Sequence, residues 1–332
     1  MIRLSALAIC ASLTAMGCAS GPQQPEAVDV AFDAARLSDH TRILSADDFQ
    51  GRGIATPAED KVIAYLSQQY AAAGFEPGGD NGGWTQAVAL NRMATTNVTA
   101  RLSVGDWTQT LEQGEQAVIS TRLPDADGRV AVSAAPLVFV GYGIKAPERN
   151  WDDFKGMDLK GKVLVVLVND ADFEDPGQNT FNGRAMTYYG RWTYKYEEAA
   201  RQGAIGMLIV HEALPASYGW TTVKNSWTGP QFDIVRANAA AERIPLEGWI
   251  QRDVAARLFQ QAGLDFEALK VQARSPDFEP VTLSGATLDA QFEVASTLIE
   301  THNVIARLPG TTHADETVLF TAHWDHIGIG QP

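Results

Sequence analysis

The sequence predicts an α/β fold, because buried strands and helices alternate through its middle part. Two apolar runs, at residues 162–168 and 205–210, are typical of strands that are covered on both faces, and a third strand is predicted at 245–250. Two helices are predicted between and after these runs, at 193–202 and 253–262, and a glycine, which commonly ends a helix, follows each of them. This strand–helix–strand–strand–helix unit has enough apolar residues for a core of its own.

The composition is that of an ordinary folded protein and excludes one class of partner. A length of 332 residues predicts two domains, and 45% hydrophobic with 20% charged residues is typical of globular chains. The net charge of -14 and the pI of about 4.8 exclude nucleic acid as a partner, because phosphate binding needs clusters of Lys and Arg. The acidity indicates a well-solvated surface rather than a function.

The N-terminus has the pattern of an export signal. Arg3 precedes an apolar stretch at 4–16 that is too short to span a bilayer. The stretch ends in Ala-Met-Gly-Cys18, which resembles a bacterial lipoprotein cleavage site and predicts a signal peptide at 1–17, a lipidated Cys18 and a tether at 18–27. We therefore expect an exported, membrane-anchored lipoprotein that faces the periplasm or the cell surface. The alternative is ordinary cleavage nearby, with Cys18 incidental.

Helices are predicted in the first part of the mature chain. Apolar residues at helical spacing predict one helix at 28–44, which a turn-rich segment at 44–53 follows. A second helix is predicted to begin with Thr56 as N-cap and Pro57 in the first turn, and to end at Gly74. Glu59 stands three residues after the cap, which predicts a capping box.

The remaining elements are predicted from short apolar runs and their flanking residues. Asp253 is expected to cap the helix at 253–262, and the irregular stretch at 178–240 is interpreted as a surface loop or a binding segment. Further strands are predicted at 84–90, 97–104, 137–144, 291–299, 303–308 and 317–322.

Candidate chemistry lies in Thr-Ala-His323-Trp-Asp325-His326, where an apolar strand runs directly into a histidine. Residues two apart in an extended segment point the same way, so His323 and Asp325 are able to serve one site. A metal-bound His usually has a carboxylate that fixes its ring, and Asp325 is a candidate for that role or for orienting a catalytic group. Taken alone, this triplet also fits an ordinary hydrogen-bonded histidine at the end of a strand.

The sequence context resembles one enzyme family. The stretch 303–310 (NVIARLPG), followed after a gap by 318–326 (VLFTAHWDH), is similar to the first two catalytic strands and the first metal motif of the bacterial co-catalytic zinc aminopeptidases, peptidase family M28. This family also includes glutamate carboxypeptidase II and the non-enzymatic transferrin receptor. The segments 44–53 and 73–82 look like the N-terminal part of the same family.

The middle of the chain resembles a protease-associated domain. Its marks are FVGYGI at 139–144, WDDF at 151–154, DLKGKV at 158–163 and AAxxGA at 199–204. The resemblance implies an α/β/α zinc-peptidase sandwich with this α/β domain inserted. The implied divisions are an N-terminal peptidase part at 28–117, the insert at 118–290, and the first catalytic strands at 291–332.

The resemblance also implies roles for particular residues. His323 matches the first zinc ligand and Asp325 the acidic catalytic residue that supports it, whereas His326 is interpreted as a loop residue and Arg52 as a packing residue. In the family, two zinc ions activate a water that hydrolyses peptides, with further ligands downstream of the first motif. We therefore expect a catalytic domain that is truncated and inactive in these 332 residues.

Two alternatives stay open beside an exported zinc aminopeptidase. One is a carboxypeptidase or other amidohydrolase of the same fold. The other is a non-catalytic protein that binds peptides or partners through the protease-associated domain. The expected partners are a peptide substrate and, through the lipid anchor, a membrane, while the oligomeric state is not predicted.

Overall fold

The computed structural model describes residues 31–124 and 128–329, so the predicted signal peptide, Cys18 and the tether lie outside the described residues. The chain forms two compact units, Met1–Phe49 and Gln50–Pro332. The described part of the first unit holds α1 (Ala34–Leu44), whose N-cap Asp33 accepts hydrogen bonds from the main-chain N–H groups of Ala35 and Arg36. The helix predicted at 28–44 is thus confirmed from Ala34 onward.

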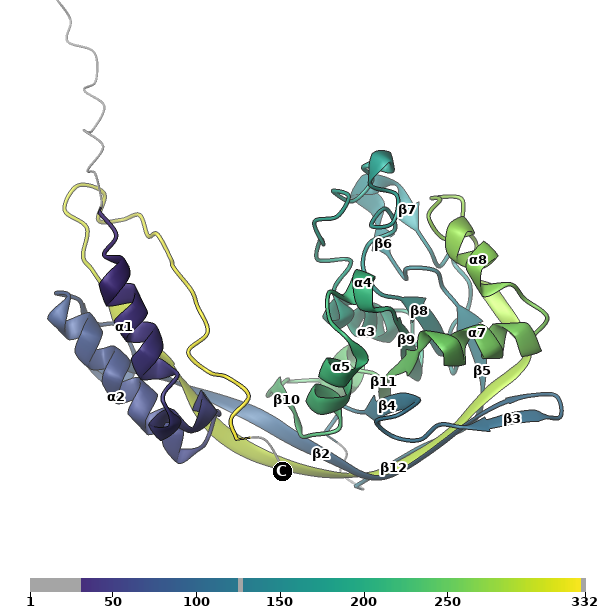
Figure 1. Cartoon of the computed structure of the whole chain (residues 1–332), viewed down its shortest axis with the longest axis horizontal. Coiled ribbons are helices and arrows are strands. Elements are labelled where there is room, and N and C mark those ends of the chain that lie inside the picture. The colour runs from purple at the N-terminus through teal and green to yellow at the C-terminus, as the bar shows by residue number, and fades with distance from the viewer. Residues whose placement is uncertain (1–30, 125–127, 330–332) are drawn as a thin grey trace, which may run out of the picture. The chain divides into compact units, whose positions relative to one another are not determined.

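The second unit is built on a mixed sheet of nine strands, which confirms the predicted α/β class (Figure 1). Eight strands lie in the order β10-β2-β12-β5-β8-β9-β11-β4, and β3 pairs with β2. The four strands β5, β8, β9 and β11 run parallel to one another, and the other pairs are antiparallel. The strands are β2 (Thr85–Val104), β3 (Trp107–Thr110), β4 (Ala117–Ser120), β5 (Arg129–Phe139), β8 (Val163–Leu167), β9 (Gly206–His211), β10 (Gln231–Ile234), β11 (Leu246–Gln251) and β12 (Val281–Val304).

Smaller elements complete the second unit. Two short strand pairs lie outside the large sheet: β1 (Glu76–Pro77) with β13 (Ala306–Arg307), and β6 (Lys145–Ala146) with β7 (Trp151–Asp152). The helices are α2 (Pro57–Ala72), α3 (Trp192–Arg201), α4 (Ala213–Ala216), α5 (Trp220–Trp227), α6 (Ala239–Glu242), α7 (Arg252–Gln261) and α8 (Phe266–Gln272). None of the helices in the described ranges has the length and apolarity needed to cross a bilayer.

The parallel strands are buried on both faces, as their continuous apolar runs predict. In β8, Val163, Val165 and Leu167 pack in the core that contains α7, and Leu164 and Val166 pack in the core that contains α3 and α5. The first core also contains Leu258 and Phe259 of α7, and the second contains Tyr196 of α3 and Trp227 of α5. Alternate side chains of one strand therefore serve two separate cores.

The longest pairing is the antiparallel ribbon of β2 and β12, which runs from Thr85 opposite Val304 to Val104 opposite Ala286. The strands predicted at 84–90 and 97–104 are joined into the single strand β2, and the strand predicted at 291–299 is the middle of β12. The polar segment between the two predicted strands does not break β2, because β12 pairs with it throughout. The register of this pairing shifts once, between Gln291 and Glu293, as it does at a β-bulge.

The start of α2 agrees with its prediction in all but one contact. The Thr56 hydroxyl accepts a hydrogen bond from the Ala58 N–H (3.3 Å), and Pro57 occupies the first turn. Glu59, however, accepts the N–H of Ala55 (2.5 Å) where a capping box would use the N–H of the cap residue itself. Gly74 follows the helix with a φ of +84°.

Four other predictions were wrong. The strand expected at 137–144 ends at Phe139, because Gly141 and Gly143 turn the chain with φ of +55° and +60°. The N-cap of α7 is Gln251, and Asp253 lies inside the first turn. The interpretation of 178–240 as a surface loop is wrong, because besides α3 and β9, which were predicted separately, this stretch contains α4, α5, β10 and the start of α6. A binding role of the stretch stays a prediction.

The fourth wrong prediction is the strand at 317–322. Val318, Leu319 and Phe320 are 80%, 79% and 90% exposed, and no strand of the described residues pairs with them. An apolar strand of this kind is stable only between partner strands and under cover on both faces, which the described residues do not provide here.

Candidate metal-ligand site

The predicted motif forms a local hydrogen-bonded pair. The Nδ1 of His323 donates to Oδ1 of Asp325 at 2.9 Å, and the His323 side chain is 92% exposed. A carboxylate on Nδ1 fixes the ring and leaves Nε2 as the nitrogen that faces outward, which is the arrangement of a metal-ligating histidine. The structure thus brings the two residues together, although their roles in a metal site stay a prediction.

The donor set fits one ligand position of a zinc site and no more. A structural or catalytic zinc ion takes three or four protein ligands. Within residues 31–124 and 128–329, no group of three or more His, Cys, Asp or Glu side chains is arranged to hold a metal ion. His326 enters the site only through its main-chain N–H, which donates to the carbonyl of Arg52 (2.9 Å).

Residues 51–53 hold the motif from one side. The Arg52 guanidinium Nε donates to the Trp324 carbonyl (2.9 Å), and the Gly328 N–H donates to the Gly51 carbonyl (3.0 Å). A Cβ on Gly51 would lie 2.3 Å from the Gly328 oxygen, so only glycine allows this approach. These contacts agree with the interpretation of Arg52 as a packing residue.

The backbone on this side is strained. Gln50, Gly51 and Arg52 have consecutive φ values of +46°, +65° and +51°. For a residue with a side chain, this left-handed region costs of order 1–3 kcal/mol and persists only where surrounding contacts hold it. The hydrogen bonds to Trp324, His326 and Gly328 are such contacts.

A buried carboxylate holds the motif from the other side. Glu59 is 4% exposed, and it accepts hydrogen bonds from Thr301 Oγ1 (2.9 Å) and His302 Nδ1 (2.9 Å). The carbonyl of His302 in turn accepts the indole N–H of Trp324 (2.9 Å). Sequence reasoning missed this group: it assigned Glu59 to helix capping and did not single out His302. Only the burial of Glu59 beside the end of β12 reveals it.

A second cluster of titratable groups is enclosed within the protein. Burial raises the pKa of Asp153 to about 7, although this carboxylate accepts hydrogen bonds from Trp151 Nε1 (2.7 Å) and the Ile144 N–H (2.9 Å). Burial lowers the pKa of Lys195 to about 8, and its ammonium donates to the carbonyls of Tyr142 and Asn169. Asp153 is 1% and Lys195 0% exposed, so no substrate reaches the cluster and it serves the core.

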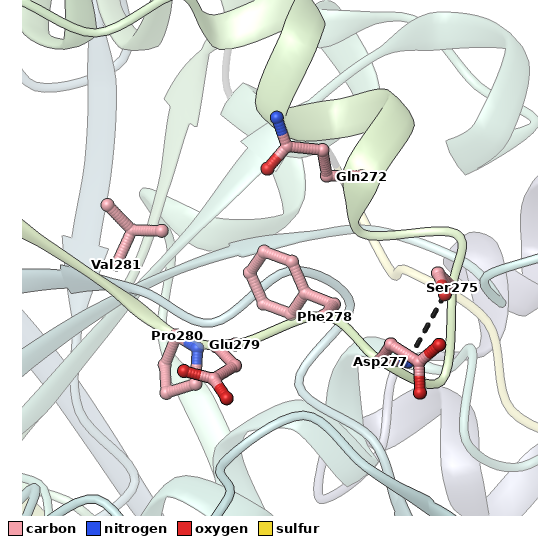
Figure 2. A pocket seen from close by; sticks show the side chains of 7 residues that line it. All are labelled: Gln272, Ser275, Asp277, Phe278, Glu279, Pro280 and Val281. Atoms are coloured by element: carbon pink, nitrogen blue, oxygen red, sulfur yellow. Dashed lines mark hydrogen bonds between the residues drawn. The ribbon is translucent and has the colours of Figure 1, made fainter.

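A shallow hollow of the described surface lies after α8. Phe278, Pro280 and Val281 form its apolar part, and Asp277 donates its N–H to Ser275 Oγ at 3.2 Å (Figure 2). Its only ionisable side chains are Asp277 and Glu279. The hollow therefore has no histidine, cysteine or lysine for catalysis, and it is not part of the candidate site.

Comparisons with known proteins point to one family. Residues 303–331 match the sequence model of Peptidase family M28. No curated protein matches the sequence significantly. Among solved structures, similar ones are an aminopeptidase from Aneurinibacillus sp. strain AM-1 (17% identity, TM-score 0.38), a Peptidase M28 precursor from Shewanella amazonensis SB2B (15%, 0.40) and BSAP, a zinc aminopeptidase from Bacillus subtilis (14%, 0.33).

These alignments cover 84%, 86% and 83% of this chain and 49%, 53% and 47% of the other chains, respectively. The chain thus spans about half the length of the solved structures that it matches. At such identities and TM-scores, the fold rests on the sheet topology described above, and the family rests on the matched segment. That segment carries His323 and Asp325, and it is similar to the model of peptidase family M28.

Proposed function

We propose that the chain belongs to an exported, zinc-dependent metallopeptidase, and specifically to an aminopeptidase that removes N-terminal residues from peptides. The observation that supports this proposal is the exposed His323 imidazole, whose ring Asp325 fixes, inside the segment that matches peptidase family M28. The aminopeptidase specificity follows from the resemblance of residues 303–310 and 318–326 to the co-catalytic zinc aminopeptidases, and it is tested separately from the metal site.

The proposed roles follow from this geometry. His323 is a zinc ligand through Nε2, and Asp325 holds the imidazole in position by accepting the proton of Nδ1 in a hydrogen bond. Bound as a pair, zinc ions would supply an activated water for peptide hydrolysis. Because the described residues contribute one ligand, we expect the 332 residues alone to be inactive and to bind zinc weakly.

The test uses the protein encoded by the complete gene. Its zinc content is measured by mass spectrometry, and its hydrolysis of aminoacyl-methylcoumarin amides is compared with that of the same substrates acetylated on the α-amine. We expect zinc, activity on the free amines and none on the acetylated compounds. Cleavage of C-terminal residues instead would support a carboxypeptidase, and a zinc-free protein that still binds peptides would support the non-catalytic alternative.

Two variants link the activity to the site. His323→Ala removes the proposed ligand, whereas His313→Ala removes another exposed histidine of the same segment, which is 73% exposed beside Glu316. We expect the first variant to lose zinc and at least 100-fold in activity, and the second to retain both. Equal behaviour of the two variants would refute the assignment of His323.

Export and anchoring are separate parts of the proposal. Cys18 would carry the lipid, which places the protein on a membrane and facing the periplasm or the cell surface. Radioactive palmitate is expected to label the wild type but not Cys18→Ser in the producing bacterium. Label retained by the variant would contradict a lipid on Cys18.

A further inference from the structure

The hydrogen bonds of Glu59 extend beyond the helix that carries it. Its carboxylate accepts from three donors: the Ala55 N–H (2.5 Å), the Thr301 hydroxyl (2.9 Å) and the His302 ring (2.9 Å). A buried carboxylate is tolerated where its lone pairs are filled in this way. The bonds from Thr301 and His302 join the start of α2 to the end of β12, which are distant in sequence, and the bond from Ala55 is local to the helix start.

The end of β12 is also where the metal-ligand motif is attached. His302 uses its ring to bind Glu59 and its carbonyl to accept the indole N–H of Trp324. Trp324 stands between His323 and Asp325, whose side chains are bonded to each other, whereas its own indole is bonded to His302. A fixed indole therefore restrains the short stretch of main chain that carries the two functional side chains.

The second attachment of the motif depends on the same start of α2. Thr56 Oγ1 donates to the Gly53 carbonyl (2.7 Å), which holds the 51–53 turn against the helix. From that turn, Arg52 Nε donates to the Trp324 carbonyl. The indole of Trp324 is thus held by His302, which is bonded to Glu59. The carbonyl of Trp324 is held by Arg52, whose neighbour Gly53 is bonded to Thr56.

We propose that Glu59 is a positioning residue for the proposed zinc site, and that it acts through His302 and Trp324 to set the orientation of His323. This inference rests on the proposed function, because it assigns Glu59 a role toward the zinc ligand. Glu59 touches neither the ligand nor a substrate. Its effect is expected in the geometry and affinity of the site, as for other residues that support a metal-ligating histidine.

The test follows the indole N–H of Trp324 by NMR in the complete protein labelled with ¹⁵N-tryptophan. Trp324→Phe removes the indole donor, keeps an aromatic ring and identifies the resonance. Glu59→Gln keeps the shape of the side chain but fills one of its acceptor positions with an amide N–H₂. Glu247→Gln is the matched control, because Glu247 is a fully buried carboxylate, 0% exposed, that pairs with Arg122 beside Trp192 and away from the motif.

We expect Glu59→Gln to shift the Trp324 indole resonance and to weaken zinc binding about 10–100-fold, measured by competition with a chelator. Trp324→Phe is expected to weaken zinc binding in the same range. Glu247→Gln is expected to shift the Trp192 resonance and to lower thermal stability, with Trp324 and the zinc affinity unchanged. Chemical shift and affinity together separate positioning from a general loss of stability.

Two results would overturn the inference. One is an unchanged Trp324 resonance in Glu59→Gln, and the other is a zinc affinity that Trp324→Phe leaves as in the wild type. If Glu59→Gln does not fold, the affinity of Trp324→Phe decides alone, because that variant removes a single hydrogen bond. A wild-type protein without zinc would refute the proposed function, whereas the Trp324 resonance would still show whether Glu59 holds the motif.

Discussion

Replacement of Gly51 by alanine tests whether the close approach of Gly51 to Gly328 holds the motif, as distinct from the cost of an alanine in the left-handed region. The new Cβ would lie 2.3 Å from the Gly328 oxygen, where an ordinary contact begins at 3.4 Å, so the two segments must part by about 1 Å. That movement lengthens the Gly328 N–H to Gly51 hydrogen bond from 3.0 Å to about 4 Å, and it strains the neighbouring bond between the His326 N–H and Arg52. Two such bonds contribute roughly 2 kcal/mol to the docking of the motif.

The matched control is Gly74→Ala, at the end of α2. Gly74 has a φ of +84°, similar to the +65° of Gly51, but a Cβ there would meet nothing within 4 Å. Both variants carry the cost of a left-handed alanine, about 1 kcal/mol, and both are expected to lower the free energy of unfolding by that amount. Only Gly51→Ala has the additional collision.

The assay is hydrogen exchange of the main-chain amides of residues 326 and 328, measured by NMR or on peptides by mass spectrometry. A loss of roughly 2 kcal/mol in local stability accelerates exchange about 30-fold. We expect this acceleration in Gly51→Ala and not in Gly74→Ala. Equal exchange in the two variants would show that residues 51–53 do not hold the motif, and the reasoning about the close approach would be wrong.

Three further experiments test the energetics of the second unit. Glu247→Leu leaves the buried Arg122 guanidinium without its partner at 2.8 Å, and it should cost about 3–5 kcal/mol in urea unfolding, whereas Arg122→Met/Glu247→Leu should recover most of that loss. The raised pKa of Asp153 means that its stabilising contribution is complete below pH 3.8 and is lost as the pH rises through about 7, at up to about 1.4 kcal/mol per pH unit. Unfolding curves of wild type and Asp153→Asn should therefore diverge between pH 4 and 7. Thr56→Ala removes the N-cap of α2 and should lower the stability by about 1 kcal/mol in the same assay.

Each of these expectations has a contradicting outcome. A double variant as unstable as Glu247→Leu would mean that the guanidinium contributes through packing on Trp192 rather than through its charge. Parallel pH curves for Asp153→Asn would show that this carboxyl has an ordinary pKa in the folded protein. An unchanged stability of Thr56→Ala would mean that the hydrogen bonds of Glu59 alone stabilise the start of α2.

The sequence predicts the parallel part of the sheet well, because there the local signal and the tertiary environment agree. The strands β8, β9 and β11 are buried and largely apolar, with the buried side chains of His211 and Glu247 as exceptions, and Gly203 and Gly263 end α3 and α7 with positive φ. The antiparallel ribbon was predicted only in pieces. Its residues alternate irregularly between exposed and buried positions, and their continuity comes from pairing with a strand far away in sequence.

The candidate site was predictable in its chemistry but not in its support. His323 and Asp325 stand two residues apart, and that spacing alone anticipates their hydrogen bond. The contacts of Glu59 with His302 join residues that are far apart in the chain, and neither residue type nor spacing indicates them. The exposed run around Phe320 shows the opposite error, since an apolar pattern predicts a strand whether or not partner strands exist.

The ribbon of β2 and β12 also constrains the order in which the protein folds. Thr85 and Val304 are neighbours in the ribbon, and β12 begins about 180 residues after β2 ends, so at ~5–20 residues per second most of β2, apart from the end that pairs with β3, waits roughly 10–40 s of synthesis for β12. During that interval its backbone N–H and C=O groups form an unprotected edge. The inner strands have shorter connections and are able to assemble first, and closure of the ribbon is then the slow, late step. The β2 segment therefore stays without its longest partner until β12 has been made.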